Sequence, residues 1–142
     1  MRIVDQYFTA LTRFATMYSD WFSRFVLFFI YFYFGLLKPF GFSPLSPMVE
    51  QMQQKTLPFI EFNQFIILLT IAEIGIATLF LIPKLTRIAV TLVILHVLTI
   101  MMPLVLLPDV TWKAPFIPTI EGQYCLKNLL ILALVLTLVK KR

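Results

Sequence analysis

Residues 62–107 read FNQFIILLTIAEIGIATLFLIPKLTRIAVTLVILHVLTIMMPLVLL, and this stretch decides the fold. It consists of two apolar runs separated by Pro83-Lys84. A hydrocarbon core about 30 Å thick needs roughly 20 apolar residues in a helix, and each run is long enough. The sequence therefore predicts two antiparallel membrane-spanning helices, over residues 62–82 and 85–107, joined by a tight turn. Pro103 is expected to kink the second helix or to end it early.

Two further apolar runs predict spans over residues 20–38 and 120–139. The chain of 142 residues is 60% hydrophobic and only 13% charged, which is more apolar surface than a soluble domain of this size can bury. We therefore expect an all-α fold, with one integral membrane domain over residues 1–142 built as a four-transmembrane-helix bundle. The proline-containing segments 39–60 and 108–119 are predicted to be loops, the first with one helical turn over Met48–Gln54.

The first 19 residues are amphipathic rather than uniformly apolar. Apolar side chains recur at three- and four-residue spacing, and polar side chains occupy the opposite face. This pattern predicts a helix that lies in the membrane interface and leads into the first span. The alternative is a continuous N-terminal extension of that span. A short apolar core followed by a small-residue cleavage site is not found, so no signal peptide is expected.

The lysines and arginines outside the spans are unevenly distributed, and this predicts the orientation of the bundle. With four spans, both termini and the Pro83-Lys84 turn share one side. The seven basic residues on that side are Arg2, Arg13, Lys84, Arg87, Lys140, Lys141 and Arg142. The other side carries Lys38, Lys55 and Lys113. Since cytoplasmic loops are enriched in lysine and arginine, both termini are expected to be cytoplasmic. We interpret the net charge of +5 as topology and lipid headgroup contact, not nucleic-acid binding.

Ionisable residues lie inside the predicted spans at Arg24, Glu73, His96 and Lys127. A charged side chain at a helix centre costs about 2.5–3.5 kcal/mol on insertion, so such groups face the bundle interior or water. Glu73 and His96 each lie about 11 residues from the turn, which places both at one depth, roughly 16 Å from it. A carboxylate and an imidazole at one level can share a hydrogen bond or a proton. The alternative is that each group satisfies a different neighbour and joins helices together.

A seven-residue spacing places Arg24, Tyr31 and Lys38 on one stripe of the first span, with Gly35 beside it. Arg24 and Lys38 lie near opposite ends of that span. Each is therefore expected to extend its charge to the nearer interface. The functional alternative is a cationic lining for an acidic or quinone-like headgroup.

The last span opens with the polar sequence EGQYCLKN, from Glu121 to Asn128. Helical spacing puts Tyr124 on the face of Glu121 and Asn128, and it puts Gln123 and Lys127 on an adjacent face. This half of the span is expected to face protein or a water-filled cavity. Lys127 lies about 10 Å below the start of the span, so an ion pair with the mid-span carboxylate is one solution. An unpaired lysine or glutamate would instead be a candidate proton carrier.

Other chemistry is poorly represented in the sequence. Cys125 is the one cysteine, so neither an intrachain disulfide nor a dithiol motif is possible, and a small buried side chain is its expected role. No cluster of histidine, cysteine and acidic residues has metal-ligand spacing. No nucleophile can be paired with a base. The sequence therefore predicts neither a metal site nor catalytic residues, and independent catalysis is not expected.

Several short motifs, taken in order, resemble the DoxX-like family of membrane proteins. They are an early arginine at Arg24, FGLLK at 34–38 with the proline-rich FSPLSP at 42–47, AEIG at 72–75, Pro83 with Arg87, and EGQYCLKN at 121–128. The resemblance covers residues 20–139. It implies a bacterial four-helix protein of the inner (cytoplasmic) membrane, similar to the small subunit of thiosulfate:quinone oxidoreductase and to redox-associated proteins. The recurring polar positions that it implies are Arg24, Gly35, Lys38, Glu73, Arg87 and Lys127. The single cysteine departs from the relatives that use dithiols.

The buried polar groups and the resemblance lead to a first functional hypothesis, a ligand-binding or accessory subunit of a membrane redox or stress-response assembly. An outward-opening polar pocket would hold a quinone or a lipid headgroup. The expected ligand-binding residues are Lys38, Glu73, His96, Lys127 and Asn128. The expected structural polar residues are Arg24, Tyr31, Arg87, Glu121, Gln123 and Tyr124. The expected partners are membrane lipids and either a second copy of the chain or another membrane protein.

Two alternatives compete with this hypothesis. One is a structural or assembly protein whose buried charges pair internally and bind no ligand. The other is a small transporter or proton pathway, which requires oligomerisation because four helices leave little room for alternating access in a monomer.

Overall fold

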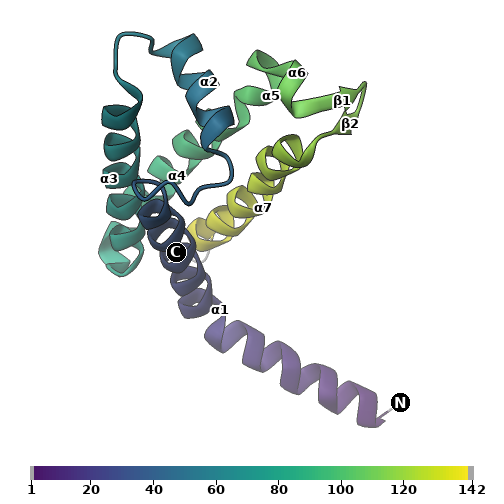
Figure 1. Ribbon diagram of the computed structural model, residues 1–142. Helices are drawn as coiled ribbons and strands as arrows, with labels where there is room; N and C mark the ends of the chain where they lie inside the picture. The colour runs from purple at the N-terminus through teal and green to yellow at the C-terminus, as the bar shows by residue number, and fades with distance from the viewer. Residues whose placement is uncertain (1, 141–142) are drawn as a thin grey trace.

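The computed structural model describes residues 2–140, with side chains described over residues 4–139, and its long elements are all helices. The four helices that are long and apolar enough to cross a membrane are α1 (Arg2–Leu37), α3 (Phe62–Phe80), α4 (Thr86–Met101, taken with the short turns at its ends) and α7 (Ile120–Lys140). α1 packs mainly on α3, and α7 packs mainly on α4 (Figure 1). The predicted all-α architecture with four candidate spans is confirmed.

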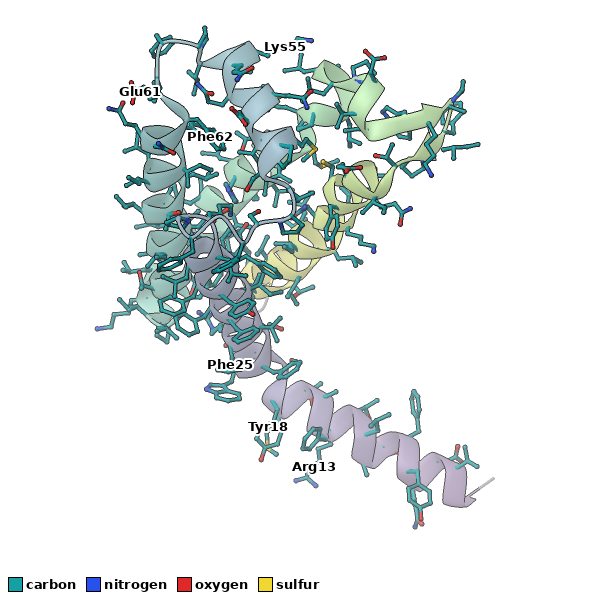
Figure 2. The ribbon with its side chains drawn as sticks, viewed as in Figure 1. Arg13, Tyr18, Phe25, Lys55, Glu61 and Phe62 are labelled. Carbon is teal, nitrogen blue, oxygen red and sulfur yellow. The ribbon has the colours of Figure 1, made fainter. Side chains whose placement is uncertain are left out.

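α1 runs through the predicted boundary between residues 1–19 and the first span. The helix continues for 36 residues, about 54 Å at the rise of an α-helix, and no proline lies within it. This is the continuous extension that the sequence left open as the alternative. The N-terminal half, exposed from Val4 to Tyr18, projects away from the bundle (Figure 1). Figure 2 labels Arg13 and Tyr18 on the projecting part and Phe25 near the point where α1 joins the other helices.

The turn between α3 and α4 is the 3-10 helix η1 (Pro83–Leu85), at the position predicted from Pro83-Lys84. Thr86 opens α4, and its hydroxyl donates a hydrogen bond of 2.7 Å to the carbonyl of Pro83. We call this end of the bundle the turn end and the opposite end the loop end. Between the two ends, one apolar cluster joins all four long helices, with side chains from Leu27, Tyr31, Ile76, Ala77, Phe80, Ala89, Val90, Val93, Val97, Val135 and Leu138.

The predicted effect of Pro103 on the third span is confirmed. α4 ends at Met101, and the chain resumes as the short helix α5 (Pro103–Leu106). Proline lacks the amide hydrogen that an uninterrupted helix requires, so the ladder of hydrogen bonds breaks at this position.

The segment 39–60 is more ordered than predicted. It contains α2 (Ser46–Thr56), a helix of 11 residues, where the sequence indicated a single turn. Two side chains hold α2 in place: Gln53 donates to the carbonyls of Leu57 (2.8 Å) and Ile60 (2.6 Å), and Lys55 donates to Leu106 (2.6 Å). Figure 2 labels Lys55 on α2, with Glu61 and Phe62 at the start of α3.

The segment 108–119 folds into the helix α6 (Pro108–Thr111) and a hairpin of β1 (Trp112–Ala114) with β2 (Ile117–Pro118). The sequence predicted only a loop here. The hydroxyl of Thr119 accepts the amide hydrogen of Gly122 at 3.1 Å, an N-cap bond that fixes the start of α7.

Candidate functional site

Gly35 sets the depth at which α1 meets α3. A Cβ atom built on Gly35 would stand 3.3 Å from the Cβ atom of Glu73, so any larger residue at this position would require α3 or Glu73 to shift slightly. The hydroxyl of Thr70 donates to the carbonyl of Gly35 at 3.3 Å. Glu73 lies about 16 Å along α3 from Phe62. α1 therefore ends about halfway along α3, and Lys38, the residue after α1, lies at the depth of the carboxylate.

Glu73 is the centre of the candidate site, and its two carboxylate oxygens have different partners. Lys38 forms an ion pair with Oε2. Nε2 of His96 lies 3.3 Å from Oε1, so the structure brings together the two groups that the sequence placed at one depth, and of the two alternatives it shows the direct contact. The side chains of Glu73, His96 and Lys38 are only 7%, 10% and 13% exposed. A buried carboxylate is thus compensated by a cation and an imidazole from two other segments of the chain.

Tyr31 extends this cluster by one more group. Its hydroxyl oxygen lies 3.3 Å from Nδ1 of His96, and the two rings are tilted at a centroid distance of 5.4 Å. Because a carboxylate can only accept, a neutral imidazole in this arrangement donates from Nε2 to Glu73 and accepts the Tyr31 hydrogen at Nδ1. We call Lys38, Glu73, His96 and Tyr31 the Glu73 cluster. Tyr31 was expected to have a structural polar role, and the structure places it in contact with the expected ligand-binding residues.

An apolar layer separates the Glu73 cluster from the turn end. Leu27, Ala77 and Val93 each lie about one helical turn toward the turn end from a member of the cluster, and none of the three is exposed. The polar groups of the cluster therefore continue toward the loop end through Lys38, and side chains without ionisable groups fill the level below them.

Arg24, which was expected to extend its charge to the nearer interface, is bound within the chain near the turn end. Its side chain is 8% exposed, and it is held between Asp20, at 2.9 Å from Nε, and the hydroxyl of Thr86, at 2.7 Å from Nη1. The seven-residue stripe that Arg24 shares with Tyr31 faces α3 and α4, which explains the burial. Arg87, in contrast, is exposed near the turn end.

The polar half of α7 is not part of the Glu73 cluster. No ion pair joins Lys127 to Glu73 over the residues whose side chains are described; the Lys127 ammonium lies 5.9 Å from the centre of the Tyr124 ring. The amide of Asn128 donates to the carbonyl of Tyr124 at 2.8 Å. Gln123 and Lys127 are exposed, and Glu121 is half-buried. Lys127 and Asn128 were expected to line the same site as Glu73, but no hydrogen bond or ion pair among the described side chains joins either of them to the Glu73 cluster.

The rotation of α7 has a physical reason. A Cβ atom on Gly122 would stand 2.1 Å from the carbonyl oxygen of Thr111, so this face of α7 is pressed against α6. Cys125, one turn further on the same side, is fully buried, as the sequence indicated for this residue. The side chains of Gln123 and Lys127 consequently point away from the chain's own helices.

Sequence reasoning placed Lys38 in the site but did not identify it as the partner of Glu73. It also missed Thr70, which lies one turn before Glu73 and anchors Gly35. The signal for both was the pair of Gly35 and Lys38 at the end of the first span, since a glycine marks a place where another helix can approach. Across residues 4–139, no group of three histidine, cysteine or acidic side chains is arranged to hold a metal ion.

No family model matches the chain, and neither a curated protein nor a solved structure matches it.

Proposed function

We propose that this chain is a DoxX-like multi-pass membrane protein that binds the polar head of a lipophilic ligand, a quinone or a lipid headgroup, at the Glu73 cluster. One observation carries the proposal: a carboxylate at mid-span depth is held by Lys38 and His96 from two neighbouring segments. Ionisable groups at this depth are expensive and mark functional sites in membrane proteins. The four apolar helices are consistent with this placement.

Each member of the cluster has a chemical role in this proposal. Lys38 is more exposed than its partner Glu73 and lies on the loop-end side of the cluster. Its ammonium group therefore contacts an oxygen of the ligand head. Glu73 and His96 orient that head or exchange a proton with it. Tyr31 holds the imidazole from the other side. With a neutral imidazole the cluster carries no net charge, which suits the carbonyl oxygens of a quinone.

The assembly and orientation that we propose are supported by the distribution of basic residues and by the exposed polar side of α7. The basic residues favour a cytoplasmic location for both termini and the turn end, and the resemblance favours a bacterial inner membrane. The N-terminal half of α1 then lies in the cytoplasmic interface as an amphipathic segment. The exposed polar side of α7, with Gln123 and Lys127, is the contact for a second copy or for another membrane protein of a redox or stress-response assembly.

A second candidate is a structural or assembly protein without a ligand. The observation in its favour is that both oxygens of Glu73 already have partners inside the chain. A proton pathway through the monomer is disfavoured by the apolar layer of Leu27, Ala77 and Val93.

The test compares ligands retained during purification. The protein is purified in mild detergent, and its extract is analysed for quinones and lipids by mass spectrometry. Lys38→Met should remove most of the retained ligand, and Lys127→Met, a matched change on the exposed side of α7, should leave it unchanged. His96→Gln serves the same purpose if Lys38→Met fails to fold. Equal retention by Lys38→Met, His96→Gln and the wild type would contradict ligand binding and favour the structural role.

A further inference from the structure

The turn end holds a second buried cation whose hydrogen bonds are incomplete. Nε and Nη1 of Arg24 have acceptors in Asp20 and Thr86. Nη2 is buried and has no hydrogen-bond partner in the part of the chain that the structure describes. A buried donor without an acceptor lowers the stability of the folded chain. An acceptor from outside the chain would complete the guanidinium group.

The surroundings of Arg24 are basic and lie at the level of lipid headgroups. Lys84 and Arg87 flank Thr86 along the chain, and both are exposed. The carboxylate of Asp20, about half exposed, opposes these three cations, so the local charge is positive. Trp21, next to Asp20, is 66% exposed. Tryptophan is enriched where the membrane meets water, which places this region at the headgroup level.

A shallow groove on the exposed face of α4 shares Arg87 with this basic region. Its lining residues are Arg87, Ile88, Thr91 and Leu92. The hydroxyl of Thr91 donates to the carbonyl of Arg87 at 2.9 Å, so this polar group is already satisfied. The groove therefore combines a cation at the headgroup level with apolar walls that suit an acyl chain.

We propose that the turn end binds an anionic phospholipid. The phosphate contacts Arg24, Lys84 and Arg87, and one acyl chain occupies the groove of Ile88 and Leu92. A phosphate oxygen supplies the acceptor that Nη2 of Arg24 lacks, and a bidentate contact between guanidinium and phosphate is among the strong hydrogen-bonding arrangements in proteins. Basic pockets between membrane helices on one face of the bilayer are typical sites for anionic headgroups. This site is separate from the Glu73 cluster and independent of its ligand.

The test measures lipid adducts of the purified full-length protein by native mass spectrometry. The added lipids are phosphatidylglycerol, phosphatidylcholine and diacylglycerol with identical acyl chains. Retention should be highest for phosphatidylglycerol and lowest for diacylglycerol. Arg87→Gln and Lys84→Gln, both at exposed positions, should each lower the affinity for phosphatidylglycerol about fivefold without changing the melting temperature in lipid-free detergent. Lys113→Gln, an exposed lysine of the hairpin, should leave the affinity unchanged.

Two results would overturn the proposal. Diacylglycerol retained as well as phosphatidylglycerol would show that the phosphate is not recognised. An equal loss of affinity in Lys113→Gln and Arg87→Gln would show that only overall charge matters. A third arm adds inorganic phosphate at the same concentration as the lipid: displacement of phosphatidylglycerol would identify a soluble anion as the ligand and contradict the lipid assignment. Arg24→Lys keeps the charge but loses the second guanidinium nitrogen, and it should also lower lipid retention.

Discussion

Oε1 of Glu73 lies 3.3 Å from Nε2 of His96, and the two residues come from consecutive antiparallel helices at the same distance from the turn that joins them. The contact is buried, and the opposite carboxylate oxygen is occupied by Lys38. Removal of one partner would leave a charge or a polar group unsatisfied at mid-span depth. The Glu73 cluster therefore links the packing of three segments to the chemistry that we propose for the site.

The protonation state of His96 is open to direct measurement because the chain contains one histidine. With Glu73 as acceptor, the neutral ring should carry its hydrogen on Nε2, and Nδ1 should accept from Tyr31. Nitrogen-15 NMR of histidine-labelled protein should show this tautomer. Tyr31→Phe should shift the Nδ1 resonance and lower stability by about 1 kcal/mol, the usual net contribution of one hydrogen bond. An unshifted Nδ1 signal in Tyr31→Phe would contradict the contact.

The close approach of α1 and α3 predicts a difference between two glycines of the bundle. Gly35→Val should lower the free energy of unfolding by about 1–3 kcal/mol, since the added atoms collide with Glu73 and overpack the interface. Gly75→Val is the matched control because nothing lies within 4 Å of a Cβ atom at that position. Thermal unfolding in detergent should separate the two variants. Equal melting temperatures would show that α1 does not pack on α3 at Gly35.

Gly122 fixes the rotation of α7, and its replacement should disturb this end of the bundle. Gly122→Ala places a Cβ atom 2.1 Å from the backbone oxygen of Thr111, which cannot rotate away as a side chain can. We expect a loss of stability of about 1–3 kcal/mol or more. Gly75→Ala, measured in the same assay, should instead gain up to about 1 kcal/mol from helix propensity. A Gly122→Ala protein as stable as the wild type would refute the packing of α7 on α6.

The proposed orientation predicts which positions are reached from outside the cell. In a Cys125→Ala background, a cysteine in place of Lys113 should react with a membrane-impermeant maleimide in intact cells. A cysteine in place of Lys84 should react only after the membrane is permeabilised, because the turn end is cytoplasmic in this orientation. The reverse pattern of labelling would invert the topology.

The sequence predicted those features of the structure that depend on local sequence: the tight turn, the four apolar spans and the effect of one proline. The tight turn at Pro83-Lys84 fixes the register of α3 against α4, so counting residues was sufficient to place Glu73 and His96 at one depth. That the two side chains face each other did not follow from the count. The four spans follow from hydropathy, because a membrane helix needs about 20 apolar residues. The end of α4 before Pro103 follows from the chemistry of proline alone.

The parts that could not be predicted depend on packing between distant segments. Lys38 is the partner of Glu73 because Gly35 lets α1 end against the middle of α3, and hydropathy does not record that depth. Lys127 is exposed because the Gly122 side of α7 packs against Thr111 of α6, a contact between segments that the sequence predicted only as a loop and a span. The sequence left the continuity of α1 open as an alternative and could not decide it, since amphipathic and apolar segments can share one helix.

The ion pair between Lys38 and Glu73 is the central claim, and a double-mutant cycle measures it most directly. The cycle compares the wild type, Lys38→Met, Glu73→Gln and the double variant. Their unfolding is followed in detergent, and a second cycle with Lys127→Met in place of Lys38→Met is the matched control. Lys38→Met should cost about 3–5 kcal/mol because it leaves a buried carboxylate unpaired, and Glu73→Gln should restore a large part of that loss. Lys127→Met should show no coupling to Glu73→Gln beyond about 0.5 kcal/mol. If Lys127 is coupled to Glu73 and Lys38 is not, the account of this site is wrong.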